Sequence, residues 1–326
     1  MLAPYRHPDT GRSIVQVLNT GIPFAVLWFL MYRSLAVSYW LTLLLAIPAS
    51  GLLLRLFIIQ HDCGHGSFLK SQRLADALGF AIGIVTLVPY RYWRKTHAIH
   101  HATSGNLDQR VFGDIDTLTV EEYRRRSRWG RLGYRLYRHP LVLLGLGPLY
   151  QFVLKHRFPA DAPRAWRREW MDVHMTNVAL AGIVGIMWVT IGPVAFLLVQ
   201  VPLTLLSGSI GIFLFYAQHQ YEDTYWRRAG NWDFYEAGLR GSSHMVMPRV
   251  LRWFTGNIGL HHIHHIASRI PNYKLQRCFD ENPALQNVTR LTLRESLRTL
   301  RMTLWDEDSR TLIGFRDLKR LPVSQS

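Results

Sequence analysis

Residues 173–221 read VHMTNVALAGIVGIMWVTIGPVAFLLVQVPLTLLSGSIGIFLFYAQHQY and contain no Asp, Glu, Lys or Arg. Only Ile191, Gly192 and Pro193 suggest a turn, so the stretch has room for two membrane spans of ~20 residues each. Soluble helices usually carry a charged face every turn or two, and this stretch has none. It therefore predicts a transmembrane hairpin with spans at about 173–191 and 194–217.

A second hairpin is predicted near the N-terminus. The chain is uncharged between Arg33 and Arg55, and residues 13–32 form another apolar stretch without charge. These regions predict spans at about 13–32 and 36–59. We therefore expect an all-α polytopic membrane protein with four transmembrane helices in two hairpins. Residues 60–172 and 218–326 would form a helical cap on one side, and residues 1–326 a single domain.

Two shorter apolar runs, 77–90 and 141–154, are too short to cross a bilayer and contain Gly or Pro. They predict re-entrant or interfacial helices. The basic segment 124–138 carries interleaved aromatic residues and predicts a helix lying on anionic headgroups. Both features place additional helices at the membrane surface.

The chain has 38 Lys and Arg against 22 Asp and Glu, a formal net charge of +16. Such an excess on a soluble domain would suggest nucleic acid binding. Here the basic residues flank the predicted spans on one side: Arg6, Arg12, Lys70, Arg73, Arg157, Arg164, Arg167, Arg168, Arg227 and Arg228. The other side has Arg33. By the positive-inside rule the basic side is cytoplasmic, so the charge predicts membrane topology and no nucleic acid partner.

Nine of the 15 histidines fall in three short windows. These are His61 and His65; His97, His100 and His101; and His261, His262, His264 and His265. Spacings of three and four place imidazoles on one helix face, where several can bind one metal region. The predicted spans bring all three windows to the cytoplasmic face, and His219 at the end of the last span would face them. His262 is left out as an extra residue.

The predicted ligands are therefore His61, His65, His97, His100, His101, His219, His261, His264 and His265. Nine neutral imidazoles are too many for one ion, so they predict a dinuclear site. Imidazole binds zinc, copper, iron and nickel alike. Structural zinc is commonly held in closed sites with thiolates, and the two cysteines, Cys63 and Cys278, do not supply such a set. A pair of redox-active irons that uses O2 fits the ligand surplus better.

Carboxylates and amides near the windows are candidates to orient the imidazoles: Asp62, Asp108, Glu222, Asp223 and Asn257. A ligating histidine commonly donates its second N–H to such a group. His7, His139, His156, His174 and His244 lack the window spacing and are interpreted as interfacial or core residues. Whether His262 or Asn257 joins the metal ligands is left open.

The windows read HDCGHGSF from His61, THAIHH from Thr96 and GLHHIHH from Gly259, and the last continues to PNY at residues 271–273. In these motifs the chain resembles the membrane-bound fatty acid desaturases, which have histidine boxes and a di-iron site. The similarity is closest to bacterial relatives of the delta-12 (omega-6) acyl desaturases, and it covers nearly the whole chain.

The resemblance implies an oxygen-dependent oxidoreductase that inserts a cis double bond into a fatty acyl chain. The substrate would be a lipid-linked or thioester-linked acyl group, and the cofactors two iron ions, with O2 as co-substrate. It further implies a separate electron donor of the ferredoxin or cytochrome b5 type, and a bacterial inner membrane with the active site facing the cytoplasm. The basic segment 124–138 offers an alternative role in docking an acidic donor.

Two other functions remain compatible with the motifs. A di-iron hydroxylase or ketolase of an alkane, sterol or carotenoid could use the same histidine spacing. A histidine-rich metal-binding or transport protein of the membrane would not be an enzyme, and it predicts ligands distributed along a path near the bilayer midplane.

Overall fold

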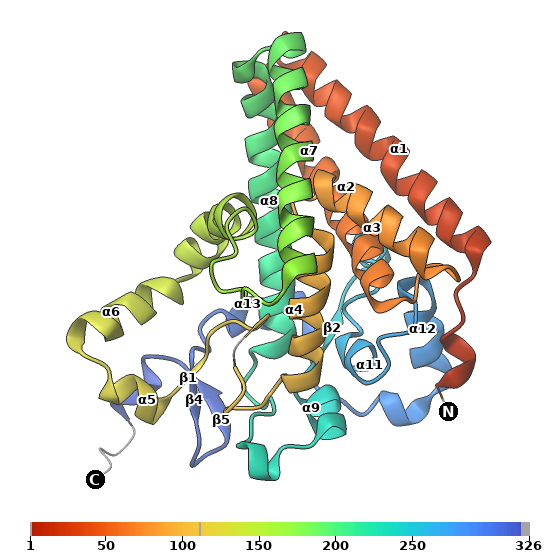
Figure 1. Ribbon diagram of the computed structural model, residues 1–326. Helices are drawn as coiled ribbons and strands as arrows, with labels where there is room; N and C mark the ends of the chain where they lie inside the picture. The colour runs from red at the N-terminus through yellow and green to blue at the C-terminus, as the bar shows by residue number, and fades with distance from the viewer. Residues whose placement is uncertain (1, 111, 321–326) are drawn as a thin grey trace.

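The computed structural model describes residues 2–110 and 112–320, and four long apolar helices dominate it (Figure 1). They are α1 (Thr10–Ser34), α2 (Tyr39–His65), α7 (Arg167–Ile191) and α8 (Pro193–His219), each long and apolar enough to cross a membrane. They extend the predicted spans by a few residues at most ends. The prediction of a helical membrane protein is confirmed.

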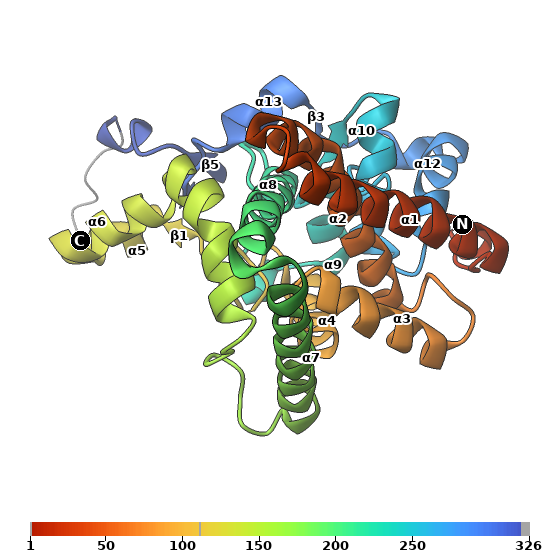
Figure 2. The same cartoon turned by 90° about the horizontal axis from the view of Figure 1, so that it is seen from above.

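The four helices form two hairpins whose turns lie at the end of the molecule remote from the cap (Figure 1). Gly192 separates α7 from α8 with a φ of 83°, a backbone conformation that glycine adopts without steric cost. Seen from above, α2 and α8 lie toward the middle, with α1 and α7 outside them (Figure 2). In the most apolar stretch of each helix, the share of the stretch that is buried inside the protein is 61% for α2 and 28% for α8. The corresponding shares are 17% for α1 and 6% for α7. The two inner helices thus carry most of the internal packing.

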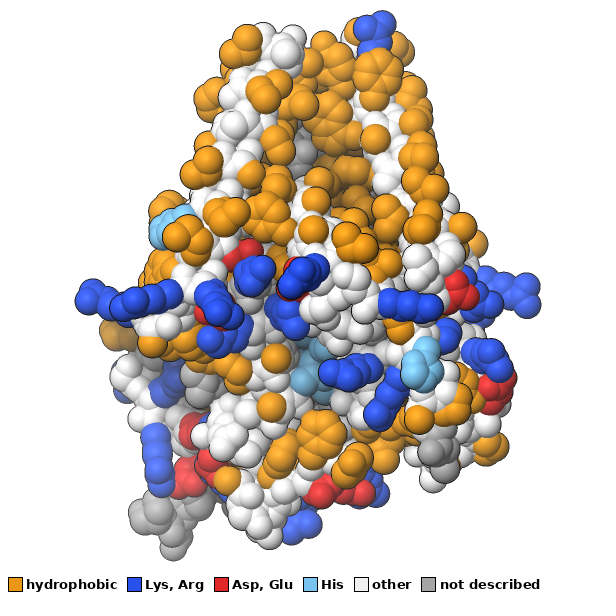
Figure 3. Space-filling view, turned by 45° about the vertical axis from the view of Figure 1, so that its right-hand side comes forward, with side chains coloured by type: hydrophobic (Ala, Val, Ile, Leu, Met, Phe, Trp, Pro, Cys, Tyr) orange, Lys and Arg blue, Asp and Glu red, His pale blue; other side chains and the backbone are white. Residues whose placement is uncertain are grey.

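The outer surface of this bundle is apolar, and the charged side chains lie below it (Figure 3). Val189 and Val194 are 89% and 69% exposed on either side of the turn. Lys and Arg side chains gather in a band where the bundle meets the cap (Figure 3). An apolar belt above a basic band is the pattern that a bilayer and its headgroups require. The protein is therefore a membrane protein.

Shorter helices build the cap beneath the bundle. They are α3 (Gln72–Val85), α4 (Tyr90–Thr103), α5 (Val120–Arg125), α6 (Arg128–Tyr137), α9 (Phe234–Arg240), α10 (Arg249–Phe254), α11 (His261–Ile266), α12 (Asn272–Glu281) and α13 (Leu293–Thr299). Single 3₁₀ turns occur at Ala3–Tyr5, Ala229–Asn231, Pro283–Leu285 and Asp317–Lys319.

The two shorter apolar runs differ in structure. Residues 77–90 cover most of α3 and the break before α4, and the two helices meet at a bend of 103°. Residues 141–154 fall on two π-helical segments, Val142–Leu146 and Leu149–Lys155. Neither run is a single straight span, which agrees with their short length.

Among the described residues, five short strands complete the cap, and they were not predicted from the sequence. A three-stranded sheet has the order β1 (Leu118–Thr119), β4 (Leu304–Asp306), β5 (Thr311–Ile313), with β1 parallel and β5 antiparallel to β4. β2 (His244–Val246) and β3 (Arg290–Thr292) form a parallel pair. Strands of two or three residues are too short to show an alternating pattern, so they depend on tertiary contacts.

The sequence predicts that the basic segment 124–138 lies on the surface, but in the structure part of this segment is buried. Trp129 is 81% exposed, but Arg138 at the end of α6 is 1% exposed. Its guanidinium donates to the Tyr216 hydroxyl at 2.8 Å and to Gln220 Oε1 at 2.9 Å, and also to the Met302 carbonyl at 2.9 Å. Arg138 therefore ties the cap to the end of α8.

Candidate metal centre

The first histidine pair lies on the last turn of α2. His61 and His65 are four residues apart and project from one face, because an α-helix turns ~100° per residue. The helix ends at Gly66, whose φ is 66°. A Cβ at Gly66 would lie 2.7 Å from Gln72 Oε1, so both the backbone conformation and the space favour glycine.

The other rings come from three different elements. His97, His100 and His101 lie on α4, and His261, His264 and His265 on α11. His219 is the last residue of α8. The ends of two inner spans and two cap helices thus meet at one place, below the apolar belt.

The nine predicted residues divide into two groups, and in each the ligand atoms lie within 4.8 Å of one another. The first group is His61, His65, His97, His101 and His264, and the second is His100, His219, His261 and His265. In all three boxes the residues four apart stay together, whereas in the second and third boxes the residue at spacing three joins the other group. The spacing of the second box would allow its three rings to converge, but His100 joins the second group, whereas His97 and His101 join the first.

Imidazole nitrogens face one another inside both groups. The Nε2 atoms of His61 and His264 are 3.0 Å apart, those of His97 and His101 are 3.1 Å apart, and those of His219 and His261 are 2.9 Å apart. Nitrogens at right angles around one ion, with bonds of ~2.1 Å, would be about 3.0 Å apart. The observed separations fit shared metal coordination.

Several buried nitrogens have no hydrogen-bond partner among the described residues. Among the nine rings they are Nε2 of His65, His100 and His265, and Nδ1 of His261. Burial, and then the neighbouring histidines, hold the pKa values of His264 and His265 well below the ordinary value. Rings that stay neutral keep a lone pair available for a metal. The unpaired nitrogens and the all-imidazole donor set therefore fit a resident metal in each group.

The two groups adjoin each other. The rings of His101 and His265 stack with centroids 4.2 Å apart, and those of His100 and His101 are 5.7 Å apart. This contact places the two groups side by side as one continuous cluster of rings rather than two remote sites. A path of ligands through the bilayer, as a transporter would require, is not the arrangement of these nine rings.

Three hydrogen-bond acceptors contact the Nδ1 atoms of histidine rings and so orient these rings. Asp62 Oδ1 lies 3.1 Å from His61 Nδ1, and Asp114 Oδ1 lies 2.6 Å from His100 Nδ1. The Gly241 carbonyl lies 2.9 Å from His219 Nδ1. Such contacts fix the tautomer that directs Nε2 to a metal. Asp62 was among the residues predicted to orient the histidines, whereas Asp114 and the Gly241 carbonyl were not. Asp114 follows His100 by fourteen positions, and at that separation helical spacing does not predict a contact.

The remaining candidates have other partners. Asp108 pairs with Arg228 at 2.8 Å, and the Asn257 amide donates to the Asn272 carbonyl at 3.1 Å. No hydrogen bond between a described box histidine and Glu222 or Asp223 is present. His262 Nε2 lies 3.0 Å from the Leu285 carbonyl, so this ring turns away from both groups. His7, His139, His156, His174 and His244 also lie outside the two groups.

Comparison with known proteins gives consistent matches. The family model "Fatty acid desaturase" matches residues 37–294. A fatty acid desaturase of Bacillus subtilis is 47% identical over 323 residues, covering 99% of this chain and 91% of that protein. The sn-1 acyl-lipid omega-3 desaturase (ferredoxin) of Synechocystis is 31% identical over 68% of this chain and 62% of its own length. A chloroplastic omega-3 fatty acid desaturase of Sesamum indicum is 30% identical over 68% of this chain and 50% of its own length.

Proposed function

Because this chain belongs to the fatty acid desaturase family, we propose that it introduces a cis double bond into an acyl chain with two iron ions and O2. The observation that carries the proposal is the gathering of nine imidazoles into two adjoining groups at the end of the apolar bundle. The protein is an oxidoreductase by family membership. Residues 1–326 would act as one domain, since Asp9 and Tyr273 join the N-terminal segment to α12.

The proposed ligands are the five rings of the first group and the four of the second. When bound, the irons and O2 would supply the removal of hydrogen from unactivated methylene carbons, which acid and base side chains alone cannot perform. Burial holds the pKa values of His264 and His265 well below the ordinary value, so these two rings would need no deprotonation to bind metal.

The chain's own contribution is to hold these ligands in place. Asp62 accepts from the Asn272 backbone N–H at 2.7 Å and from its side-chain amide at 2.8 Å, while its other oxygen faces His61. This network links box one to the segment after box three. Ligands fixed before the reaction keep their geometry without reorganisation during it.

The substrate and the donor are inferred from relatives. The Synechocystis relative carries "acyl-lipid" and "ferredoxin" in its name, so we infer an acyl lipid and a ferredoxin-type donor for this chain. An acyl thioester and a cytochrome b5-type donor are the alternatives. The motifs resemble delta-12 enzymes, whereas several matched relatives are omega-3 enzymes. The position of the double bond is therefore part of the test.

We further infer that the cap faces the cytoplasm of a bacterial cell from the inner membrane. The band of Lys and Arg beneath the apolar belt supports this orientation (Figure 3). A soluble reduced donor would then reach the histidine groups from the cytoplasmic side.

The test is gas chromatography and mass spectrometry of fatty acids from a host that expresses the full chain. We expect a new acid two hydrogens lighter than its precursor, with its double-bond position mapped, and none in an empty-vector control. A product one oxygen heavier would instead establish the hydroxylase alternative. Unchanged lipids together with zinc and no iron in the purified protein would contradict desaturation.

A further inference from the structure

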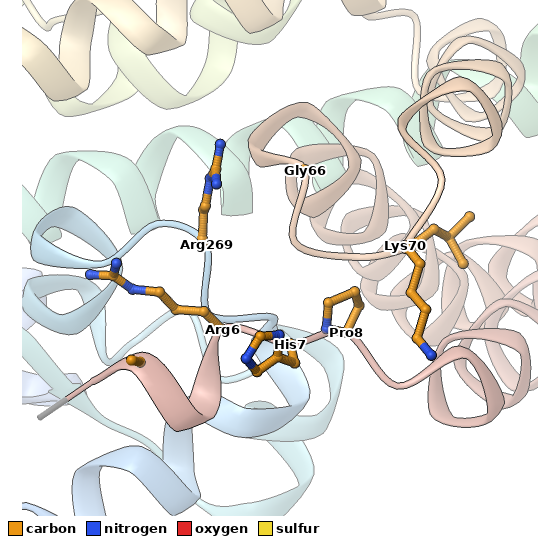
Figure 4. A pocket seen from close by; sticks show the side chains of 8 residues that line it. Arg6, His7, Pro8, Gly66, Lys70 and Arg269 are labelled. Carbon is orange, nitrogen blue, oxygen red and sulfur yellow. The ribbon is translucent and has the colours of Figure 1, made fainter.

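An open pocket lies just after the end of α2, between three parts of the chain. Its volume is about 450 Å³, within the ~300–1,000 Å³ range of small-molecule sites. It is lined by Ala3, Arg6, His7, Pro8, Gly66, Leu69, Lys70 and Arg269. In Figure 4, Arg6 and Arg269 lie toward one end and Lys70 toward the other, with His7, Pro8 and Gly66 between them.

The lining is strongly basic. Arg6, Lys70 and Arg269 are all exposed, and none of the described residues that line the pocket is acidic. No ion pair among the described residues joins any of the three cations to a carboxylate. Three unneutralised positive charges around one cavity favour an anionic ligand.

The walls of the pocket are fixed, although the charged side chains are free. The Lys274 ammonium donates to the His7 carbonyl at 2.6 Å, and the Tyr273 hydroxyl accepts from the Asp9 backbone N–H at 2.8 Å. Ser13 Oγ donates to the Phe68 carbonyl at 2.6 Å. The N-terminal segment is thus fastened both to α12 and to the loop after α2, so the cavity exists before a ligand binds.

The position of the pocket relates it to the membrane and to the histidines. It lies where α1 begins and α2 ends, which is the depth of the lipid headgroups. Gly66 directly follows His65, and Arg269 comes four residues after His265. A headgroup held here would leave its acyl chains at the border between the apolar belt and the metal centre.

We propose that this pocket binds the phosphate of an anionic phospholipid headgroup and thereby positions the attached acyl chain for reaction. The proposal rests on the proposed desaturase function. Arg and Lys form charge-assisted hydrogen bonds to phosphate oxygens, and the planar guanidinium can bind two of them at once. An uncharged lipid with the same acyl chains lacks the group that these side chains recognise.

The test compares the iron-loaded full chain with the double variant Lys70→Gln/Arg269→Gln. Saturated phosphatidylglycerol, diacylglycerol with the same chains, and a saturated acyl-CoA are offered separately with the same donor. We expect the KM for phosphatidylglycerol to rise about tenfold in the variant with little change in kcat, equivalent to about 1.4 kcal/mol of binding. Diacylglycerol should show no such increase in KM.

A matched variant, Arg294→Gln/Arg316→Gln, removes two exposed arginines that do not line the pocket. Its KM for phosphatidylglycerol should stay within twofold of the unmodified protein. The proposal is overturned by an unchanged KM in the pocket variant, by equal changes for phosphatidylglycerol and diacylglycerol, or by an effect on acyl-CoA alone. Inorganic phosphate that competes as strongly as the phospholipid would indicate a free-phosphate site and overturn it as well.

A binding measurement separates this proposal from the enzymatic one. Native mass spectrometry of the detergent-solubilised full chain counts retained phosphatidylglycerol without any turnover. If the pocket variant loses the retained phospholipid, the binding site is supported even when no acyl substrate reacts. In that outcome only the proposed desaturase function fails. Unchanged retention in the pocket variant contradicts the site whatever the activity.

Discussion

The two histidine groups differ in number, exposure and support. The first has five rings, of which His65, His97 and His101 are partly exposed, whereas all four rings of the second are buried. In the first group Asp62 orients His61; in the second, Asp114 and the Gly241 carbonyl orient His100 and His219. The second group thus has fewer ligands, and two of its four rings have an acceptor behind them, against one of five in the first group.

We expect from this difference that the two groups respond differently to loss of a ligand and to removal of metal. A group with a surplus ring and access to solvent should exchange its metal more readily. A buried group with fewer rings depends more on each ligand and on the contacts behind it. The predictions below test that distinction, beginning with the largest expected effect.

Removing a ligand should have the largest effect. His264→Ala and His265→Ala each take one ring from a different group, and both should reduce double-bond formation at least ~100-fold while leaving the protein in the membrane. Fatty acid analysis and membrane fractionation measure the two properties. The neighbouring His262→Gln is the control, because His262 contacts the Leu285 carbonyl instead, and it should retain product. Normal product levels in either alanine variant would refute the ligand assignment.

Removing a supporting carboxylate should have the next largest effect. Asp114→Asn replaces the charged carboxylate behind His100 with a neutral amide and should cost about 10–100-fold in metal affinity or activity. Metal content after dialysis, with activity measured at saturating iron, separates the two losses. Asp108→Asn is the control, because Asp108 pairs with Arg228 at the surface. Equal metal retention in the two variants would mean that Asp114 does not support the second group.

Arg138→Gln should destabilise the protein and weaken the second group. The change removes buried hydrogen bonds to Tyr216 and Gln220, which lie on either side of His219, and should cost about 3 kcal/mol of unfolding free energy. Denaturation in detergent measures the stability, and metal analysis measures the site. Arg131→Gln, within α6, is the control and should change stability by less than about 0.5 kcal/mol. A destabilised variant that keeps both metals would limit Arg138 to a structural role.

The smallest effect concerns the rate of metal loss. During treatment of the unmodified protein with a chelator, metal should leave in two phases, the faster from the partly exposed first group. Asp114→Asn should accelerate the slower phase and leave the faster one unchanged. A single phase for both metals would show that exposure does not distinguish the groups.

The histidine spacing within a box also relates to which of the two groups each ring joins, a relation that the sequence analysis did not use. His97 with His101, and His261 with His265, are each four residues apart and differ by about 40° around their helices. The residue at spacing three in each box is rotated to the other side and serves the other group. The helical period predicts the separation of these residues, but not which group each pair joins, because that depends on where α2 and α8 end.

The amino-acid sequence by itself determined the four spans, because a bilayer requires long uncharged helices, and it determined the nine candidate ligands, because imidazoles recur at helical spacing. The tertiary structure alone decided the division of those rings into groups of five and four, the burial of Arg138 and the contact between Asp114 and His100. It also brought Arg6, Lys70 and Arg269 to one pocket. Helical periodicity and hydrophobicity act over a few residues and can be read locally, whereas these contacts join distant segments whose meeting depends on how the whole chain packs.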